Sequence, residues 1–469
     1  MNNISQYKDG IIWPIIGICI SFIGIPFFFL NIAPVTFILF AYLIWMVFKG
    51  KKGYTLVLIS IALCIPGGVD GNISQNISDK VWYLFTIERI TIIIIFLYNY
   101  FILKKEIPYP NALFLAIMIV LIGYFYSLYN NASSEYINYI NSVIYIHLFF
   151  IICFWERIKL KNALILIDII FILTTLYALF EYLHIYCPYD NIYAQAIRYD
   201  DILKEIPRAK GLLGHPLVLS GITIIYQAVI VIRLFIFKRV NPFLLILCLV
   251  STAITTSRTT VIVLIIIFLY YYINSKMYSK IKQNVILLLI IFCSFALFSN
   301  IISPLLTNII ERFDDGADHR VAAFPSVLRL FLDNPLGVGS TQVTHRIIEY
   351  ADFNLIRDFT LDNFFLTQIA SYGVLAILFF MYYFFYFYKS IKFRHSYPIF
   401  YKCTLLLFLI FALMGFSFDI EAYMQILLLY YGLTGYLFSY FYKHQYVSYH
   451  YRKLQKRTED DRLCKTGAE

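Results

Sequence analysis

Three polar segments of the sequence carry groups suited to holding an anion, and each lies at the edge of a long apolar run. Arg208 and Lys210 precede one run, Arg258 closes a Thr-Thr-Ser-Arg turn between two others, and Asp362 with Asn363 opens a fourth. A guanidinium donates paired hydrogen bonds to phosphate oxygens and keeps its charge when partly desolvated. Arg208 and Arg258 are therefore candidates for holding a lipid diphosphate, the alternative being that each extends to lipid head groups.

Other kinds of active site are not indicated. The sequence has no phosphate-binding P-loop, dinucleotide glycine fingerprint, HExxH motif or nucleophile elbow, which disfavours a nucleotide-driven pump. Most cysteines lie inside apolar runs, while Cys187 falls in a polar loop and Cys464 in a basic tail. We expect neither disulfides nor a metal site, and no cofactor.

The elements that position these segments must be membrane helices. Of 469 residues, 61% are hydrophobic and 14% charged, whereas a soluble domain has about 45–50% apolar and about 25% charged residues. A helix needs roughly 20 apolar residues to cross the hydrocarbon layer. The sequence therefore predicts an all-α polytopic membrane protein with roughly 12–14 transmembrane helices, forming a single membrane domain over residues 1–469.

The predicted spans are apolar runs bounded by polar or charged residues. They lie near 11–30, 33–48, 54–66, 82–103, 111–129, 138–155, 161–184, 214–236, 242–256, 259–274, 284–303, 363–388, 398–416 and 421–441.

Lys and Arg residues in the short connections set the predicted orientation. Every second connection is basic, and cytoplasmic loops accumulate such residues. This phase places both termini in the cytoplasm, with 442–469 as a basic cytoplasmic tail. Loops 184–210 and 303–362 then lie outside. The basic residues of these connections account for the net charge of +10, so we expect no nucleic-acid partner.

The two long external loops carry cations against this bias. The smaller loop contains Arg208 and Lys210, and the larger loop contains Arg312 and Arg320. Such cations suggest an anionic ligand outside the cytoplasm, although acidic residues nearby leave a charge-balanced loop as the alternative.

A helix is predicted within the larger loop. Apolar residues recur at helical spacing from Phe324 to Leu332, with Ser326, Arg329 and Asp333 on the other side. Such a helix would lie along the membrane surface and end before Pro335.

Ionisable residues inside the predicted spans are costly in lipid and are often functional. Glu88, Arg89 and Asp168 are of this kind. A local ion pair at 88–89, or a contact with another helix, is the alternative to a functional role.

From about Arg208 to about Ala376, the order of these segments resembles the O-antigen ligase and O-antigen polymerase group of bacterial envelope glycosyltransferases. The shared features are the Arg-x-x-Gly segment, the Thr-Ser-Arg turn, a surface helix ending in Pro-Leu-Gly-Val-Gly, and Asp362-Asn363 followed by Gly373. The first two hundred residues match only as generic spans. The resemblance implies glycosyl transfer from a polyprenyl-diphosphate-linked sugar, at the external side of the bacterial inner membrane.

The resemblance also implies roles for individual residues. Ligases of this group typically have a His where this chain has Asp362, so we favour a polymerase that joins undecaprenyl-diphosphate-linked oligosaccharides, with Asp362 as catalytic base. An N-cap role is the alternative for Asp362. The residues expected at the diphosphate are Arg208, Arg258, Lys210 and Arg320. Further candidates for substrate contact are His215, Arg312, His319 and Asn363.

Two other functions stay open. His319 and His345 in the larger loop keep a ligase possible, which would transfer a finished chain to lipid A core. A flippase for the lipid-linked unit also suits the span count, although a transporter should place its cations near mid-membrane. Expected partners are membrane lipids, a chain-length regulator and a separate flippase.

Overall fold

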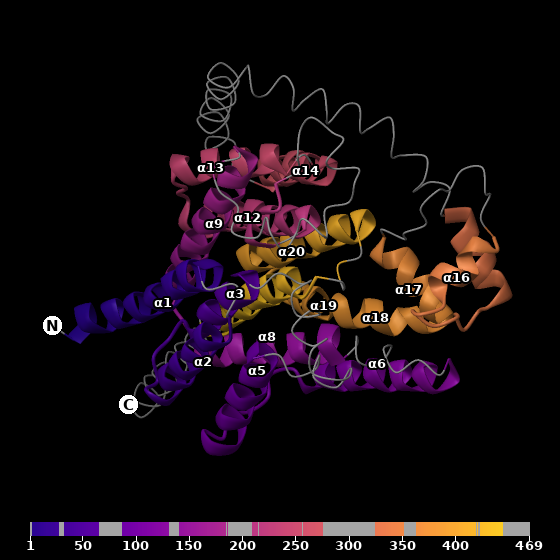
Figure 1. The fold of residues 1–469 in the computed structure, drawn as a ribbon, viewed down its shortest axis with the longest axis horizontal. Coiled ribbons are helices and arrows are strands. Elements are labelled where there is room, and N and C mark those ends of the chain that lie inside the picture. The colour runs from indigo at the N-terminus through magenta and orange to yellow at the C-terminus, as the bar shows by residue number, and fades with distance from the viewer. Residues whose placement is uncertain are drawn as a thin grey trace, which may run out of the picture.

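The structure is a computed structural model. It describes residues 2–27, 32–64, 87–130, 140–183, 185, 209–213, 215–255, 257–274, 324–350, 363–418, 420 and 423–443. The described residues are α-helical, with short 3-10 and π-helical stretches and no β-strand among them (Figure 1). This confirms the predicted all-α membrane fold.

The first part of the chain forms helices that follow the predicted spans. They are α1 (Asn2–Phe27), α2 (Ile32–Phe48), α3 (Tyr54–Cys64), α5 (Ile87–Leu97), η3 (Tyr98–Ile102), α6 (Pro110–Tyr129), η4 (Ile140–Tyr145), α8 (Ile146–Glu156) and α9 (Leu160–Tyr182).

The second part begins with a short 3-10 turn. Its elements are η5 (Gly211–Leu213), α12 (Pro216–Phe237), α13 (Pro242–Ile254), α14 (Arg258–Asn274), α16 (Val343–Ile348), α17 (Phe364–Tyr372), η6 (Gly373–Leu375), α18 (Ala376–Tyr383), α19 (Phe385–Ile391) and α20 (Pro398–Ser417). Residues 324–333 and 424–443 are also helical. Each predicted span overlaps a helix except 284–303, which lies outside the described residues.

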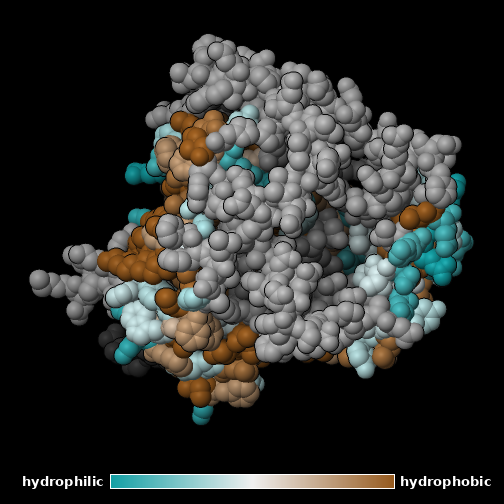
Figure 2. Space-filling view, in the orientation of Figure 1, coloured by the Kyte–Doolittle hydropathy of each residue, from teal (hydrophilic) through white to brown (hydrophobic). Residues whose placement is uncertain are grey.

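Five described helices are long and apolar enough to cross a membrane, and shorter apolar helices accompany them. The five are Pro110–Tyr129, Leu160–Tyr182, Pro216–Phe237, Phe364–Tyr383 and Pro398–Ser417. On α6, Phe114 and Phe125 are 63% and 67% exposed in the protein alone, as expected for side chains that lipid covers. In Figure 2, apolar side chains gather near α1, α2 and α5, and hydrophilic ones gather near α16.

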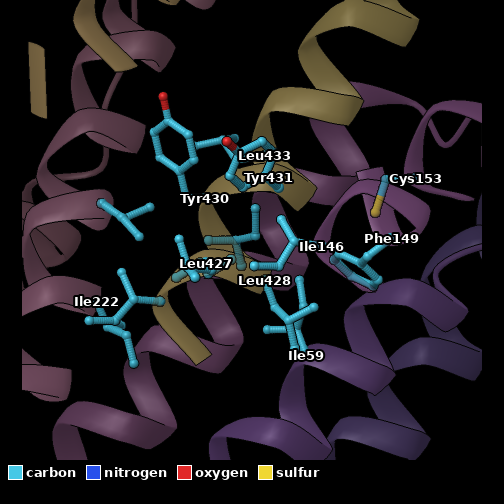
Figure 3. Packing of buried hydrophobic residues seen from close by; sticks show 14 of the residues in the cluster. Ile59, Ile146, Phe149, Cys153, Ile222, Leu427, Leu428, Tyr430, Tyr431 and Leu433 are labelled. Carbon is cyan, nitrogen blue, oxygen red and sulfur yellow. The ribbon is translucent and has the colours of Figure 1, made fainter. Parts of the chain in front are cut away.

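The helix over 424–443 forms the centre of the bundle. Leu427 and Leu428 lie between Ile222 of α12 and Ile59 of α3 (Figure 3). A Cβ added at Gly435 would meet a carbonyl oxygen of α8 at 2.9 Å, so the glycine allows these two helices to approach closely. A helix that is apolar on all sides is expected to be buried in this way.

Asp168 has partners on a neighbouring helix. Arg233 Nη2 donates to Asp168 Oδ2 at 2.6 Å, and the Tyr226 hydroxyl donates to Oδ1 at 2.8 Å. Both partners lie on α12, whereas Asp168 lies on α9. The structure therefore supports the second expectation for Asp168, a contact with another helix.

Hydrogen bonds fix the relative direction of α14 and α20. The Tyr270 hydroxyl donates to Lys402 O at 2.9 Å, and Lys402 Nζ donates to Asn274 O at 2.9 Å. The end of α14 thus meets the start of α20. Lys402 Nζ also lies 6.0 Å from the ring centroid of Phe235, which brings the end of α12 to the same place.

The starts of α12 and α14 and the end of α20 therefore share the opposite end of the bundle. We call this the outer end, defined by His215, Arg258 and Phe416, and the opposite one the inner end, after the sides that the sequence predicts for them. The connections that follow α12 and α14 contain the basic clusters beginning at Lys238 and Lys276. The helix directions thus agree with the alternation of basic connections along the sequence.

We predict that Asp168→Ala lowers the free energy of unfolding by about 3 kcal/mol, because it leaves the part-buried Arg233 guanidinium without its carboxylate. Thermal unfolding in detergent measures the change. The double variant Asp168→Leu/Arg233→Met removes both charges and should recover most of the loss. An Asp168→Ala protein as stable as the wild type, or a double variant no better than the single one, would contradict this account of the pair.

Candidate functional site

Arg258 follows a turn whose polar groups are bonded within the turn itself. Thr255 Oγ1 donates to Thr252 O at 2.8 Å, Thr260 Oγ1 donates to Ser257 O at 2.6 Å, and the two hydroxyls lie 3.1 Å apart. Arg258 is the first residue of α14, where unpaired backbone N–H groups and the helix dipole favour an anion. The backbone thus places a cationic residue at an electropositive helix terminus.

A buried amide on α12 holds this turn in place. Gln227 Nε2 donates to Thr252 Oγ1 at 3.1 Å and to Thr260 O at 3.2 Å. The first acceptor belongs to α13 and the second to α14. Because one side chain joins both helices, the backbone of Arg258 keeps a fixed position relative to α12.

The Lys210 segment lies beside the same turn. Glu181 Oε2 accepts hydrogen bonds from the backbone N–H groups of Lys210 at 2.7 Å and Gly211 at 2.5 Å. Ala209 N donates to Ile254 O at 3.3 Å, at the last residue of α13. The structure therefore brings the backbones of Lys210 and of the Arg258 turn together.

His215 caps α12 and contacts a second element. Its Nδ1 accepts from Leu217 N at 3.2 Å, so the imidazole satisfies one of the N–H groups at the helix start. The Tyr423 hydroxyl lies 3.4 Å from the same nitrogen. His215 is exposed at the outer end, and in the structure its side chain caps α12.

Asn363 caps α17. Its Oδ1 accepts from Leu366 N at 3.1 Å, and its Nδ2 donates to Phe416 O at 3.3 Å, near the end of α20. The N-cap of α17 is therefore Asn363 and not Asp362, which lies outside the described residues. The capping role considered for Asp362 is filled by its neighbour.

The loop 335–339 packs against the segment 371–374, which contains Gly373. Backbone bonds join them: Gly339 N donates to Ser371 O at 2.8 Å, and Val374 N donates to Pro335 O at 2.9 Å. A Cβ added at Gly373 would lie 2.0 Å from Pro335 O. With its φ of +54°, Gly373 is thus required both by its conformation and by the close approach of the loop 335–339.

The outer end of α6 also contacts this loop. The Tyr126 hydroxyl donates to Leu336 O, and Asn130 Nδ2 donates to Val338 O at 3.0 Å. The loop 335–339 therefore joins α6 to the break between α17 and α18.

The predicted surface helix is present over 324–333, but its buried face includes a residue assigned to the polar side. Val327 and Leu330 pack with Val343, Ile347, Leu366 and Ala370 in a second apolar cluster. Ser326 is 4% exposed, and its hydroxyl donates to Tyr350 O at 3.3 Å. Phe324, Leu328 and Leu332 of the predicted stripe are exposed. The placement of Ser326 was wrong because the neighbouring helices α16 and α17, rather than lipid alone, cover this helix.

The predicted site residues are only partly described. Lys210, His215, Asn363 and the backbone of Arg258 lie at the outer end. Arg208, Arg312, His319, Arg320 and Asp362 lie outside the described residues. Within the described part of the chain, no group of three His, Cys, Asp or Glu side chains is placed to hold a metal ion.

Sequence reasoning missed Glu181 and Gln227, which position the site. A signal existed for Gln227, because a polar amide within an apolar span needs a partner. Neither sequence position reveals which helix supplies that partner.

We predict that Gly373→Ala disrupts the junction between the loop 335–339 and α17, because the new methyl group would overlap Pro335 O. Trypsin should then cleave at the exposed Arg329 and Arg346 faster than in the wild type. Gly50→Ala is the matched control, since Gly50 also has a positive φ, +63°, but has nothing within 4 Å of an added Cβ. That control should lose only about 1 kcal/mol of stability and leave cleavage at these sites unchanged. Equal cleavage of all three proteins would show that the close approach is not needed.

Comparison with known proteins finds a match over the part of the chain that contains this candidate site. A family model described as O-antigen ligase matches residues 243–381, which include the Arg258 turn, the helix over 324–333 and Gly373. No curated protein matches the chain. Over residues 243–381, the chain is therefore similar to the O-antigen ligase family.

Proposed function

We propose that this protein polymerises lipid-linked oligosaccharide repeat units on the outer side of the plasma membrane. The donor is a chain on polyprenyl diphosphate, and the acceptor is another lipid-linked unit. The observation that carries the proposal is the placement of Arg258 at the start of α14, beside the Lys210 segment and inside the region matched by the family model.

The electrostatics of the outer end suit a diphosphate. The starts of α12, α14 and α17 are helix N-termini, whose N–H groups favour anions. Arg258 and Lys210 are cationic residues whose backbones lie at that end. Fixed donors at a water-poor boundary stabilise developing negative charge more strongly than water does. The diphosphate is accordingly proposed to lie at Arg208, Lys210, Arg258 and Arg320.

The proposed reaction is a direct displacement at the anomeric carbon of the donor. The acceptor hydroxyl oxygen forms the new glycosidic bond as the bond to the diphosphate oxygen breaks. The hydroxyl proton passes to the carboxylate of Asp362, and polyprenyl diphosphate leaves with its negative charge held by the arginines. Because Asn363 caps α17, the Asp362 carboxylate is not required for capping, which favours its role as the base.

The lipid part of the substrate needs an apolar surface beside the site. Leu328, Leu332 and Leu336 expose large apolar side chains near the loop 335–339, and Phe416 does so near Asn363. Polyprenyl chains would lie against this surface while the sugars remain in water. We further propose His215, Arg312, His319 and Asn363 as contacts to the sugars, and a chain-length regulator and a flippase as partners.

A ligase is the second candidate, because the matching family model is described as O-antigen ligase. A ligase transfers a finished chain to another acceptor, whereas a polymerase extends the chain itself. The Asp at position 362, in place of the His typical of ligases, favours the polymerase.

We predict that Arg258→Ala lowers the rate of transfer by about 10²–10³, the typical effect of losing one fixed donor to a developing oxyanion. Transfer by purified protein in detergent, with a lipid-diphosphate-linked oligosaccharide, measures the rate. Arg239→Ala at the inner end removes the same charge and should leave the rate unchanged. Wild-type transfer by the Arg258→Ala protein would contradict the role of Arg258, and no transfer by the wild type would favour a flippase.

We predict that Asp362→Asn, at normal membrane levels, leaves single repeat units on the acceptor lipid of the cell. The amide cannot accept the hydroxyl proton, so chains stop after one unit. A gel of surface polysaccharide reads the pattern. An acceptor carrying no unit at all would instead indicate a ligase, and long chains would exclude Asp362 as the base.

A further inference from the structure

The inner end contains a cavity of about 740 Å³. The connections between α2 and α3, between η3 and α6, and after α8 form its walls, together with Tyr442. Tyr442 follows Phe441, whose ring centroid lies 4.7 Å from that of Phe400 near the start of α20, so the cavity is at the inner end and separate from the proposed active site.

Cationic side chains dominate the charge of this cavity. Lys51, Lys52, Lys105 and Arg157 line it, against the acidic residues Glu106 and Glu156. The four cations come from three different connections of the chain. Their convergence on one hollow is a feature of the fold rather than of a single basic stretch of sequence.

The amino groups of two of these lysines are oriented by neutral acceptors. Lys52 Nζ donates to Arg157 O at 3.1 Å, and Lys105 Nζ donates to Asn99 Oδ1 at 2.6 Å and Trp155 O at 3.4 Å. Carbonyl oxygens fix the direction of an amino group without cancelling its charge. The positive charge therefore remains available to an anion in the cavity.

The buried acid of the cavity is engaged in holding the fold. Glu156 accepts hydrogen bonds from Gly53 N and from the Thr55 hydroxyl. These bonds tie the end of α8 to the start of α3. Glu156 and Glu106 together are two acids against four cations, so the lining keeps a net positive charge.

Burial lowers the pKa of the Lys52 and Lys105 amino groups, while the nearby Glu156 carboxylate raises both pKa values and Arg157 lowers both. Burial and mutual repulsion both disfavour the charged forms. A bound anion would relieve the repulsion.

The backbone around the cavity is held in an uncommon conformation. Tyr109 and Arg157 both line it, with φ values of 54° and 50°, in the left-handed region that non-glycine residues rarely adopt. Such conformations are concentrated at functional sites.

Large apolar side chains are exposed beside the cavity. Phe101 and Ile102 are 64% and 67% exposed in the protein alone, and Leu103, which lines the cavity, follows them directly. Exposed apolar side chains thus lie next to the cationic hollow. A lipid could contact them with its acyl chains while its head group enters the cavity.

We propose that this cavity binds the phosphate head group of an anionic phospholipid, with Lys52, Lys105 and Arg157 contacting the phosphate and the acyl chains lying along residues 101–103. The site is independent of the proposed glycosyl transfer.

The test compares binding of phosphatidylglycerol with that of phosphatidylcholine to the full chain in detergent, by native mass spectrometry. The cavity variant Lys52→Gln/Arg157→Gln should bind phosphatidylglycerol about thirtyfold more weakly, since each juxtamembrane cation contributes about 1 kcal/mol and 1.4 kcal/mol is tenfold. Lys392→Gln/Arg394→Gln is the matched control, because it removes two cations from another predicted cytoplasmic connection, and it should bind as the wild type does. Lys52→Arg/Arg157→Lys keeps both charges and should retain binding even if the neutral variant fails to fold.

Equal binding of phosphatidylglycerol by the wild type and the cavity variant would overturn the proposal, as would equal binding of the two lipids by the wild type. Glycerol phosphate added alone separates the two sources of phosphate. If it binds as tightly as the lipid at the same residues, the ligand is a soluble phosphate ester and the lipid assignment is wrong. Lipid binding that appears only after removal of residues 444–469 would identify the tail as the occupant and also contradict the proposal.

Discussion

The hydrocarbon layer offers no water to polar groups, so every polar side chain within the bundle needs a partner supplied by the protein. Asp168 accepts a hydrogen bond from Arg233, and Gln227 donates hydrogen bonds to Thr252 and Thr260. Each of these contacts joins different helices. The requirement for partners therefore also fixes the helices relative to one another, and the position of the Arg258 turn follows from it.

At the outer end, close backbone contacts continue this rigid arrangement beyond the bundle. The loop 335–339 rests against Gly373 and the end of α6, and the helix over 324–333 shares an apolar cluster with α16 and α17. Asn363 begins α17 and also binds the end of α20. An active site placed here would have a rigid base, although its substrate includes a flexible lipid.

The sequence predicted the helices well, because a charge-free apolar run such as Pro110–Tyr129 has few alternatives in a membrane. It also singled out Arg258 and Asn363, which the structure places at the same end of the bundle. It did not predict that the loop at Pro335 contacts Gly373, since that contact depends on the packing of segments far apart in the chain. The buried position of Ser326 and the convergence of cations around Lys105 escaped prediction for the same reason.

The proposed function requires Arg208 and Arg258, which are proposed to hold the diphosphate, to face the outside together. Single cysteines placed at positions 208 and 258 of a cysteine-free variant, in intact cells, can be labelled with a membrane-impermeant thiol reagent. We predict that both positions react from outside, while a cysteine at position 52 does not. Labelling of positions 208 and 258 from opposite sides of the membrane would contradict it.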